Sequence, residues 1–263
     1  MNNKALLVGI NKYPNPRNEL RGCVNDILDM EHFITETSKV YLKENIIKLT
    51  DENATKKGII TELKWLIDGA QPGDQILFHY SGHGAQAPTL FPALEKDGLD
   101  EVICPYDFDG SNDTCIRDKE FAYLFAGIPK GVHFVWISDS CHAEDLSREL
   151  KLPSEGQYRY FLGAKEANYG VNGTLIPISS PITTPLNGAL LSACASNELS
   201  ADAFINNRYN GAFTHYLIKN LMQYGNDKPM DLIIQLVNAD LSHNGYDQNP
   251  QVEGLLEKRK FFL

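Results

Sequence analysis

QILFHYSGHG at residues 75–84 and VHFVWISDSCH at residues 132–142 are the two stretches from which the expected arrangement of this chain follows. Each starts as an apolar run and ends in small polar residues. Continuous apolar runs of this length are typical of parallel strands that are buried on both faces. Because open α/β sheets place their chemistry at the carboxyl ends of such strands, we expect His83 and Cys141 to meet there as a base and a thiol nucleophile.

The other apolar patterns predict alternating strands and helices. Strands are expected at residues 5–10, 46–49, 102–104 and 189–194, with a last strand at the sheet edge at 260–262. Apolar residues at intervals of three and four predict helices at residues 20–33, 59–67, 121–125, 211–224 and 230–243. This order predicts one α/β domain with a mostly parallel sheet and helices on both faces.

Composition restricts the partners and the compartment. The net charge of −10 would repel the phosphates of nucleic acids and of anionic membranes, and it suits a cationic substrate. The five cysteines are scattered without a CxxC pair, which favours a reducing cytoplasm over a disulfide framework. The apolar run at residues 5–10 is too short for a signal peptide or a membrane span. We therefore expect a cytoplasmic protein.

His83 and Cys141 each have a less reactive interpretation that the residues alone leave open. A histidine between two glycines is often a turn residue without a role, and a cysteine at the end of a strand is normally an inert small hydrophobe. A zinc pair of His79 and His83 would need a helix and a glutamate after the first histidine, whereas this segment is expected to be a strand and a turn. For peptide-bond cleavage, the N–H groups of Gly84 and Cys141 are candidate oxyanion donors.

Several motifs along the chain resemble one family. His-Tyr-Ser-Gly-His-Gly around His83 and Asp-Ser-Cys-His around Cys141 are similar to the signatures of metacaspases and prokaryotic caspase homologues (orthocaspases), which are caspase-like clan CD cysteine peptidases. Further stretches resemble other parts of that family in the same order, at residues 5–11, 20–26, 97–105, 192–202 and 249–251. The resemblance therefore extends over nearly the whole chain.

The resemblance implies a caspase-like fold with a six-stranded, mostly parallel sheet in a single domain over residues 1–263. Residues 1–142 would be the large-subunit-like part, 143–187 a linker, and 188–263 the small-subunit-like part. It implies that Cys141 is the nucleophile, that His83 is the base and acid, and that Gly84 supplies an oxyanion N–H.

The resemblance also implies a specificity pocket that is acidic. Its predicted members are Cys23, Asp26, Asp139, Ser192 and Asp202, with residues 192–202 forming one wall. Carboxylates that face one pocket require a cation, and an arginine can bind them through two hydrogen bonds. We therefore expect cleavage of protein or peptide substrates after Arg or Lys. We also expect the enzyme to be a monomer.

Calcium dependence is disfavoured, and no other cofactor is expected. Family members that need calcium use acidic residues after the histidine, and the candidates here are Asp97, Asp100 and Asp118. Lys119 and Arg148 stand where the family commonly has acidic residues, and cations there would repel Ca²⁺. Metal binding at these positions is therefore a weak expectation.

The linker contains four basic residues after which the enzyme could cut itself: Arg148, Lys151, Arg159 and Lys165. The alternatives are an uncut surface loop and, for the whole chain, a catalytically inactive caspase-like scaffold or binding protein. A phosphate-binding α/β enzyme is a poorer interpretation because the chain lacks GxxxxGK[ST] and GxGxxG motifs.

Overall fold

A six-stranded sheet forms the centre of the computed structural model, which describes residues 2–91, 98–141, 156–161, 186–195, 198–256 and 258–263. Its strands are β1 (Lys4–Gly9), β2 (Ile46–Thr50), β3 (Gln75–Ser81), β7 (His133–Asp139), β9 (Ala189–Ser192) and β12 (Gln251–Glu253). They are arranged in the order β12-β9-β7-β3-β1-β2, and every neighbouring pair is parallel except β12 with β9. The predicted six-stranded, mostly parallel sheet is confirmed.

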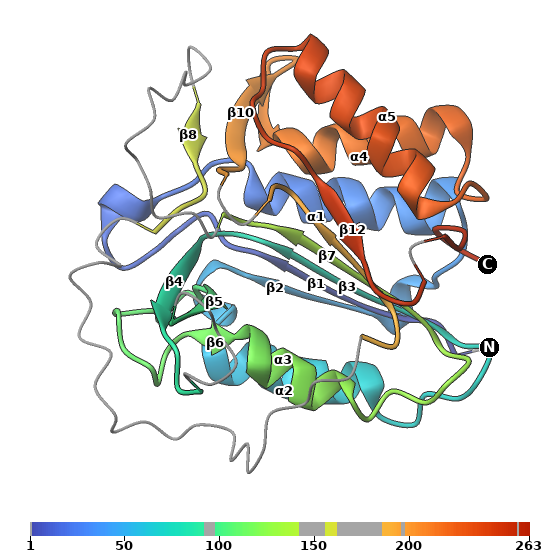
Figure 1. The fold of residues 1–263 in the computed structure, drawn as a ribbon, viewed down its shortest axis with the longest axis horizontal. Coiled ribbons are helices and arrows are strands. Elements are labelled where there is room, and N and C mark those ends of the chain that lie inside the picture. The colour runs from blue at the N-terminus through green and yellow to red at the C-terminus, as the bar shows by residue number, and fades with distance from the viewer. Residues whose placement is uncertain (1, 92–97, 142–155, 162–185, 196–197, 257) are drawn as a thin grey trace.

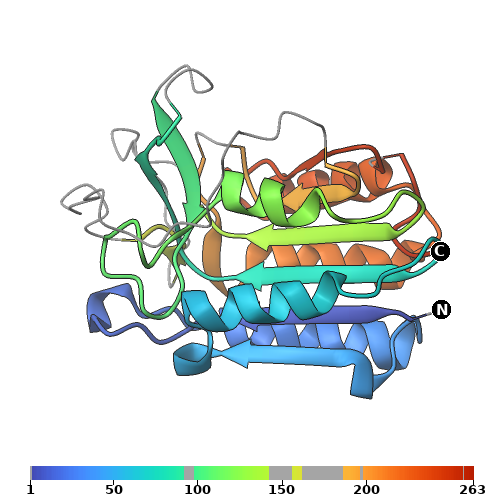
Figure 2. The ribbon, with the colours of Figure 1, turned by 90° about the horizontal axis from the view of Figure 1, so that it is seen from below.

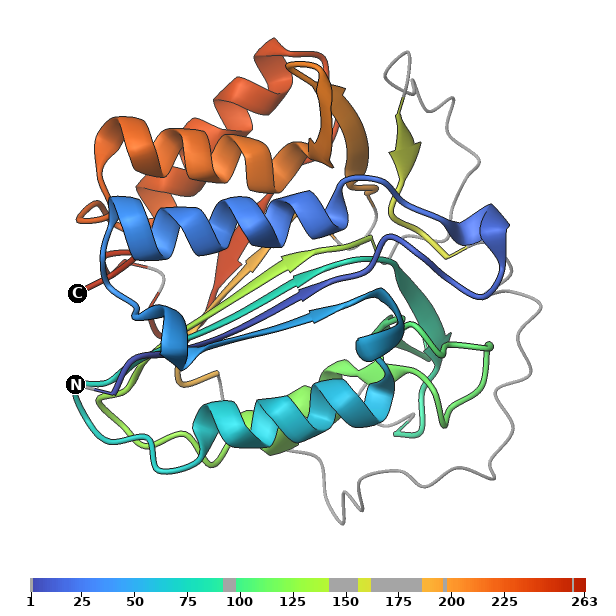
Figure 3. The same ribbon diagram turned by 180° about the vertical axis from the view of Figure 1, so that it is seen from behind.

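Helices cover both faces of this sheet, as Figures 1 and 3 show. The helices α1 (Cys23–His32), α4 (Ala212–Tyr224) and α5 (Met230–His243) lie on one face, and α2 (Lys56–Ile67) and α3 (Asp118–Phe125) lie on the other. Single turns occur at η1 (Pro16–Asn18), η2 (Phe33–Thr37), η3 (Lys43–Asn45) and η4 (Asp51–Asn53). Thr55 caps α2 by accepting a hydrogen bond from the N–H of Gly58.

The strands are apolar on both faces because each face packs against its own hydrophobic core. In β3, Ile76 and Phe78 belong to the core beneath α2 and α3, whereas Leu77 belongs to the core beneath α1, α4 and α5. Side chains alternate between faces along a strand, so a continuous apolar run supplies both cores. Figure 2 shows the parallel strands pointing away from the side of the molecule where both termini lie.

Two small sheets extend beyond the central one. The first is built from β4 (Gly84–Pro88), β5 (Leu99–Ile103) and β6 (Ile116–Arg117), and the second from β8 (Gln157–Tyr158), β10 (Ala201–Ile205) and β11 (Arg208–Gly211). Of these strands, only β5 overlaps a strand expected from the sequence, at residues 102–104. Both small sheets lie past the carboxyl ends of β3 and β7 (Figure 1).

The predicted edge strand at residues 260–262 is wrong. The edge strand is β12, which pairs with β9, whereas the only pairing of residues 260–262 in the described structure is an isolated bridge between Lys260 and Pro229. Phe261 and Phe262 are buried in the core beneath α1, α4 and α5 instead. The apolar side chains of these residues are buried, but an apolar segment can be buried either as a strand or as a coil, so their sequence does not distinguish the two.

Among the described helices, none has both the length and the apolar character that crossing a membrane requires.

We expect Phe125→Ala to lower the free energy of unfolding by about 3–5 kcal/mol, because it leaves a cavity in an aromatic cluster. The ring of Phe125 lies 4.6 Å from that of Phe134 and 5.5 Å from that of Trp136, between centroids. Urea unfolding of Cys141→Ala protein, which avoids any self-cleavage, measures the loss. Phe204→Ala, at a side chain that is 42% exposed, is the control. Equal losses in the two variants would contradict the assignment of Phe125 to the core.

Candidate active site

The side-chain alternation of β3 and β7 brings polar residues together at the carboxyl end of the sheet. Ser81 is directly opposite Asp139 in the parallel register. Both side chains face the helices α1 and α4, because Ser81 donates to Asp26 of α1 and Asp139 accepts from Thr214 of α4. His83 and Cys141 follow two residues after these positions, so both candidate dyad residues lie at the same edge.

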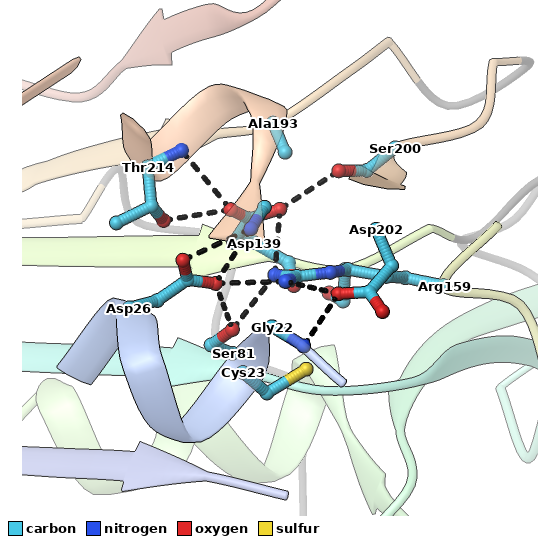
Figure 4. A network of polar contacts seen from close by, with 12 residues as sticks. Gly22, Cys23, Asp26, Ser81, Asp139, Arg159, Ala193, Ser200, Asp202 and Thr214 are labelled. Carbon is cyan, nitrogen blue, oxygen red and sulfur yellow. Dashed lines mark hydrogen bonds and ion pairs between the residues drawn. The ribbon is translucent and has the colours of Figure 1, made fainter. Parts of the chain in front are cut away.

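Three buried carboxylates surround one pocket at this edge (Figure 4). They belong to Asp26 in the first turn of α1, Asp139 at the end of β7, and Asp202 in β10, and each is fully buried. The predicted acidic pocket residues therefore come together, although they are far apart in the sequence.

Backbone donors fix the position of each carboxylate. Asp26 Oδ1 accepts from the N–H of Gly211 at 2.9 Å, and Asp139 Oδ2 accepts from the N–H of Thr214 in the first turn of α4 at 3.1 Å. Asp202 Oδ1 accepts from the N–H of Gly22, just before α1, at 2.9 Å. Amide donors at helix amino termini favour negative charge, and each carboxylate still has an oxygen that faces the pocket.

The guanidinium of Arg159, a linker residue, fills this pocket. Its Nη2 lies 2.7 Å from Asp26 Oδ2 and 3.0 Å from Asp202 Oδ1, and its Nη1 lies 3.1 Å from Asp139 Oδ1. Nη1 also donates to the hydroxyl of Ser81 at 2.7 Å. A single cation thus contacts all three carboxylates, and Arg159 is fully buried.

Burial raises the pKa of Asp26 to about 6, although the Arg159 guanidinium opposes the shift, and the carboxylate of Asp139 adds to it. Burial also raises the pKa of the Cys23 thiol, while the charge of the Arg159 guanidinium acts in the opposite direction. Cys23 is therefore an uncharged residue near the guanidinium. The charge in this pocket comes from the carboxylates.

The main chain around Arg159 is bound as an extended peptide. Its N–H donates to the carbonyl of Ser200 at 3.0 Å, and the two residues before it form β8, which pairs antiparallel with β10. The carbonyl oxygen of Arg159 accepts from the N–H of Gly84 at 3.1 Å and from the N–H of Cys141 at 3.3 Å. These are the two N–H groups that the sequence indicated as oxyanion donors, and they polarise the Arg159 carbonyl.

Cys141 and His83 each form hydrogen bonds with the backbone of another segment. The Cys141 sulfur accepts from the N–H of Ser200 at 2.7 Å, and its S–H donates to the Ser200 carbonyl at 3.2 Å. The Nε2 of His83 lies 2.7 Å from the Asn18 carbonyl. Because a carbonyl only accepts, Nε2 carries the proton, and Nδ1 is left as the basic nitrogen.

The His83 imidazole is neutral in this arrangement. Burial lowers the pKa of His83 to about 4, while the carbonyls of Asn18 and Arg159 act in the opposite direction. Its Nδ1 makes no hydrogen bond with any residue that the structure describes. A general base needs a free lone pair within hydrogen-bond reach of the proton that it takes, and the lone pair of Nδ1 is free.

Ser192 lies apart from the acidic pocket. It ends β9 and lines a cavity of about 370 Å³ together with Ser138 and Cys194. Ser138 precedes Asp139, so its side chain faces the opposite side of the sheet. No contact between Ser192 and Arg159 occurs in the described structure, and only the far end of the predicted 192–202 wall, at Ser200 and Asp202, reaches the guanidinium cluster.

Several site residues were not singled out from the sequence. Ser81 lies inside the HYSGHG motif and Ser200 inside the 192–202 stretch, so both had a signal nearby. Thr214 and Asn18 had none, because their roles depend on where α4 and the loop after β1 pack. Gly211 is required by space, since a Cβ there would clash with the side chains of Asp139 and Arg159.

The two calcium candidates that the structure describes, Asp100 and Asp118, are paired with side-chain cations. Asp97 lies outside the described residues. Asp100 has both oxygens in ion pairs, Oδ2 with Arg117 at 2.6 Å and Oδ1 with Lys119 at 2.5 Å, and Asp118 lies 3.2 Å from the same Lys119 ammonium. Among described residues, no cluster of three or more His, Cys, Asp or Glu side chains is placed to hold a metal. The cations hold the oxygens that Ca²⁺ would need.

Comparison with known proteins agrees with this geometry. The family model of the metacaspase peptidase C14 domain matches residues 3–148. Metacaspase-1 of Coccidioides immitis is 31% identical over 95% of this chain, which spans 60% of that protein.

Two solved structures show the same fold. A protein of Geobacter sulfurreducens superposes with a TM-score of 0.77 at 22% identity, covering 99% of this chain and 98% of its own. Caspase-1 of Spodoptera frugiperda does so with a TM-score of 0.64 at 10% identity, covering 98% and 88%. With the caspase-like fold and the matching family model, this chain belongs to the metacaspase family of cysteine-type endopeptidases.

Proposed function

We propose that this chain hydrolyses peptide bonds on the carboxyl side of Arg or Lys, with Cys141 as the nucleophile and His83 as the base and acid. One observation carries the proposal. Arg159 places its guanidinium among three carboxylates and its carbonyl oxygen between the N–H groups of Gly84 and Cys141. A substrate residue bound in this way would present its carbonyl carbon to the cysteine and its side chain to the acidic pocket.

The proposed reaction follows from the positions of the donors. The Nδ1 of His83 takes the thiol proton, and the Cys141 sulfur attacks the carbonyl carbon. The negative charge that forms on the carbonyl oxygen is stabilised by the N–H groups of Gly84 and Cys141. His83 then protonates the leaving amine, and water releases the acyl group from the sulfur.

Specificity for a basic residue is supported by the charge in the pocket. Three carboxylates face one guanidinium, so an excess of negative charge remains, and the backbone donors stabilise it. An arginine fork can contact more than one carboxylate at once, whereas a lysine ammonium acts as a compact point charge. An aspartate substrate side chain would be repelled by the same groups.

The position of linker residues 157–161 also supports self-processing, at the bond between Arg159 and Tyr160. Of the four basic residues in the linker, Arg159 is the one within the described structure, and Arg148, Lys151 and Lys165 lie outside it. While this bond is intact, residues 157–161 occupy the positions that a substrate would need. We propose that the uncut linker competes with substrates, and that cleavage after Arg159 relieves this competition.

We expect purified wild-type protein to yield fragments ending at Arg159 and starting at Tyr160, as detected by intact-mass spectrometry. Cys141→Ala should stay intact because it lacks the nucleophile. Arg159→Ala should lose this cut because it lacks the cation for the pocket, whereas Lys165→Ala should retain it. An intact wild type, or unchanged cutting in Arg159→Ala, would refute the assigned bond.

We expect fluorogenic peptides that end in Arg or Lys to be hydrolysed and the Asp-terminated analogue to be resisted. Asp26→Asn should lower kcat/KM for the Arg peptide by at least about 100-fold, because it removes a charged hydrogen-bond partner from a buried cation site. Asp29→Asn, at a partly exposed carboxylate one turn along α1, is the control. If no peptide is turned over and Cys141 also resists iodoacetamide, the inactive scaffold is the better interpretation.

We propose that activity does not need calcium, because Arg117 and Lys119 neutralise Asp100 internally. Adding EGTA at about 10 mM should leave peptide turnover unchanged, and Ca²⁺ should not increase it. A loss in EGTA that Ca²⁺ restores would contradict this proposal. The same assay on Lys119→Gln tests whether the internal cation is responsible, since its loss would leave Asp100 with one partner.

A further inference from the structure

A second hollow beside the acidic pocket holds an aromatic ring of the linker. Phe161 is the second residue after the Arg159–Tyr160 peptide bond, and its side chain is buried, with 9% of the residue exposed. Its N–H donates to the carbonyl of Gly84 at 3.1 Å. The N–H of the same glycine binds the Arg159 carbonyl oxygen. Gly84 therefore fixes the position of Phe161 relative to the bond that faces Cys141.

Three aromatic side chains form the walls of this hollow. The Phe161 ring centroid lies 4.8 Å from that of Phe108, 5.8 Å from that of Tyr13 and 5.8 Å from that of His83. The interplanar angles are 76°, 73° and 87°, so all three contacts are edge-to-face. This geometry is the favoured arrangement for aromatic pairs and adds to the gain from burying the ring.

The walls are held by contacts that do not involve the linker. The Tyr13 hydroxyl accepts from the N–H of His83 at 3.0 Å and donates to the carbonyl of Cys104 at 3.2 Å. The N–H of Phe108 donates to the carbonyl of Pro105 at 3.0 Å. The hollow is therefore formed by the enzyme itself, and the linker ring fills it.

We propose that Tyr13, His83 and Phe108 form a specificity subsite for an aromatic side chain at the second residue after the cleaved bond. The inference rests on the proposed endopeptidase activity, because it takes residues 157–161 as the model of a bound substrate. The subsite would narrow the preferred substrates from any peptide with a basic residue before the cleaved bond to peptides in which Phe, Tyr or Trp also stands two positions after that basic residue. Since the His83 ring is itself a wall, an aromatic side chain there also excludes water from the base.

The test compares internally quenched peptides with the linker sequence GQYRYFLG, residues 156–163, and the same peptide with Phe161→Ala. With self-processed wild-type protein, we expect kcat/KM to be about 10-fold higher for the peptide that contains Phe, because an aromatic side chain is lost from a formed apolar site in the other. Equal values for the two peptides would overturn the proposal.

Two variants locate the effect in the structure. Phe108→Ala should reduce the Phe-to-Ala preference to about 2-fold or less, because the closest wall is gone. Tyr123→Ala, at an exposed tyrosine on α3, should keep both the activity and the preference of wild type. A full preference in Phe108→Ala would refute the assigned subsite.

A fluorogenic peptide that ends in Arg and has no residue after the cleaved bond separates this proposal from the proposed function. If that peptide is cleaved while the Phe and Ala peptides are cleaved equally, the endopeptidase assignment stands and the subsite fails. If no peptide is cleaved, the endopeptidase assignment fails, and calorimetric titration of the Cys141→Ala, Arg159→Ala double variant tests the subsite alone. The dissociation constant of the Phe peptide should then be about 10-fold lower than that of the Ala peptide, and equal constants would overturn the subsite.

Discussion

The contact between the Arg159 guanidinium and three buried carboxylates is the interaction on which the arrangement at the sheet edge depends. Removing a carboxylate from water costs several kcal/mol unless hydrogen bonds and an opposite charge compensate. Here each carboxylate has a backbone donor, and the cation is shared among Asp26, Asp139 and Asp202. If the cation leaves, the pocket must fill with water or with another cation, and this requirement is the physical basis of the selection for a basic residue that we propose.

The covalent tether helps the linker to occupy the proposed site. A tethered segment has an effective concentration on the order of millimolar, so even a weak peptide competes well with substrates at lower concentration. The backbone pairing of β8 with β10 adds to the side-chain contacts of Arg159. Cutting the chain after Arg159 would break the connection between Arg159 and Tyr160. The segment that starts at Tyr160 and includes Phe161 would then stay attached to the protein only through the residues that follow it.

The strands β3 and β7 and the positions of His83 and Cys141 at their ends were predictable because the signal is local: an apolar run that ends in small polar residues specifies a buried strand and the edge where its polar residues lie. The acidic pocket was predictable only through the family resemblance, since Asp26 and Asp202 are 176 residues apart and nothing local brings them together. The contact of His83 with Asn18 depends on how a loop packs, which no periodicity encodes. The linker shows the same limit, because its four basic residues are equivalent as cations. Arg159 is distinguished by its neighbours in the sequence. The residues before it pair with β10, and Phe161 after it enters the aromatic hollow. Both β10 and the hollow form only when the chain folds.

The small sheet of β4, β5 and β6 connects the internal ion pairs to the geometry of the proposed catalytic site. Gly84 is opposite Ile103 in this sheet, and on the same sheet Asp100 of β5 pairs with Arg117 of β6. Burial alone would raise the pKa of Asp100, but the hydrogen bond from Lys119 and the charges of Lys119 and Arg117 lower it below its ordinary value. The carboxylate thus stays ionised and ties β5 to β6, which supports the strand that carries the proposed oxyanion donor of Gly84. In this chain the side-chain cations of Arg117 and Lys119 provide that support from within the protein.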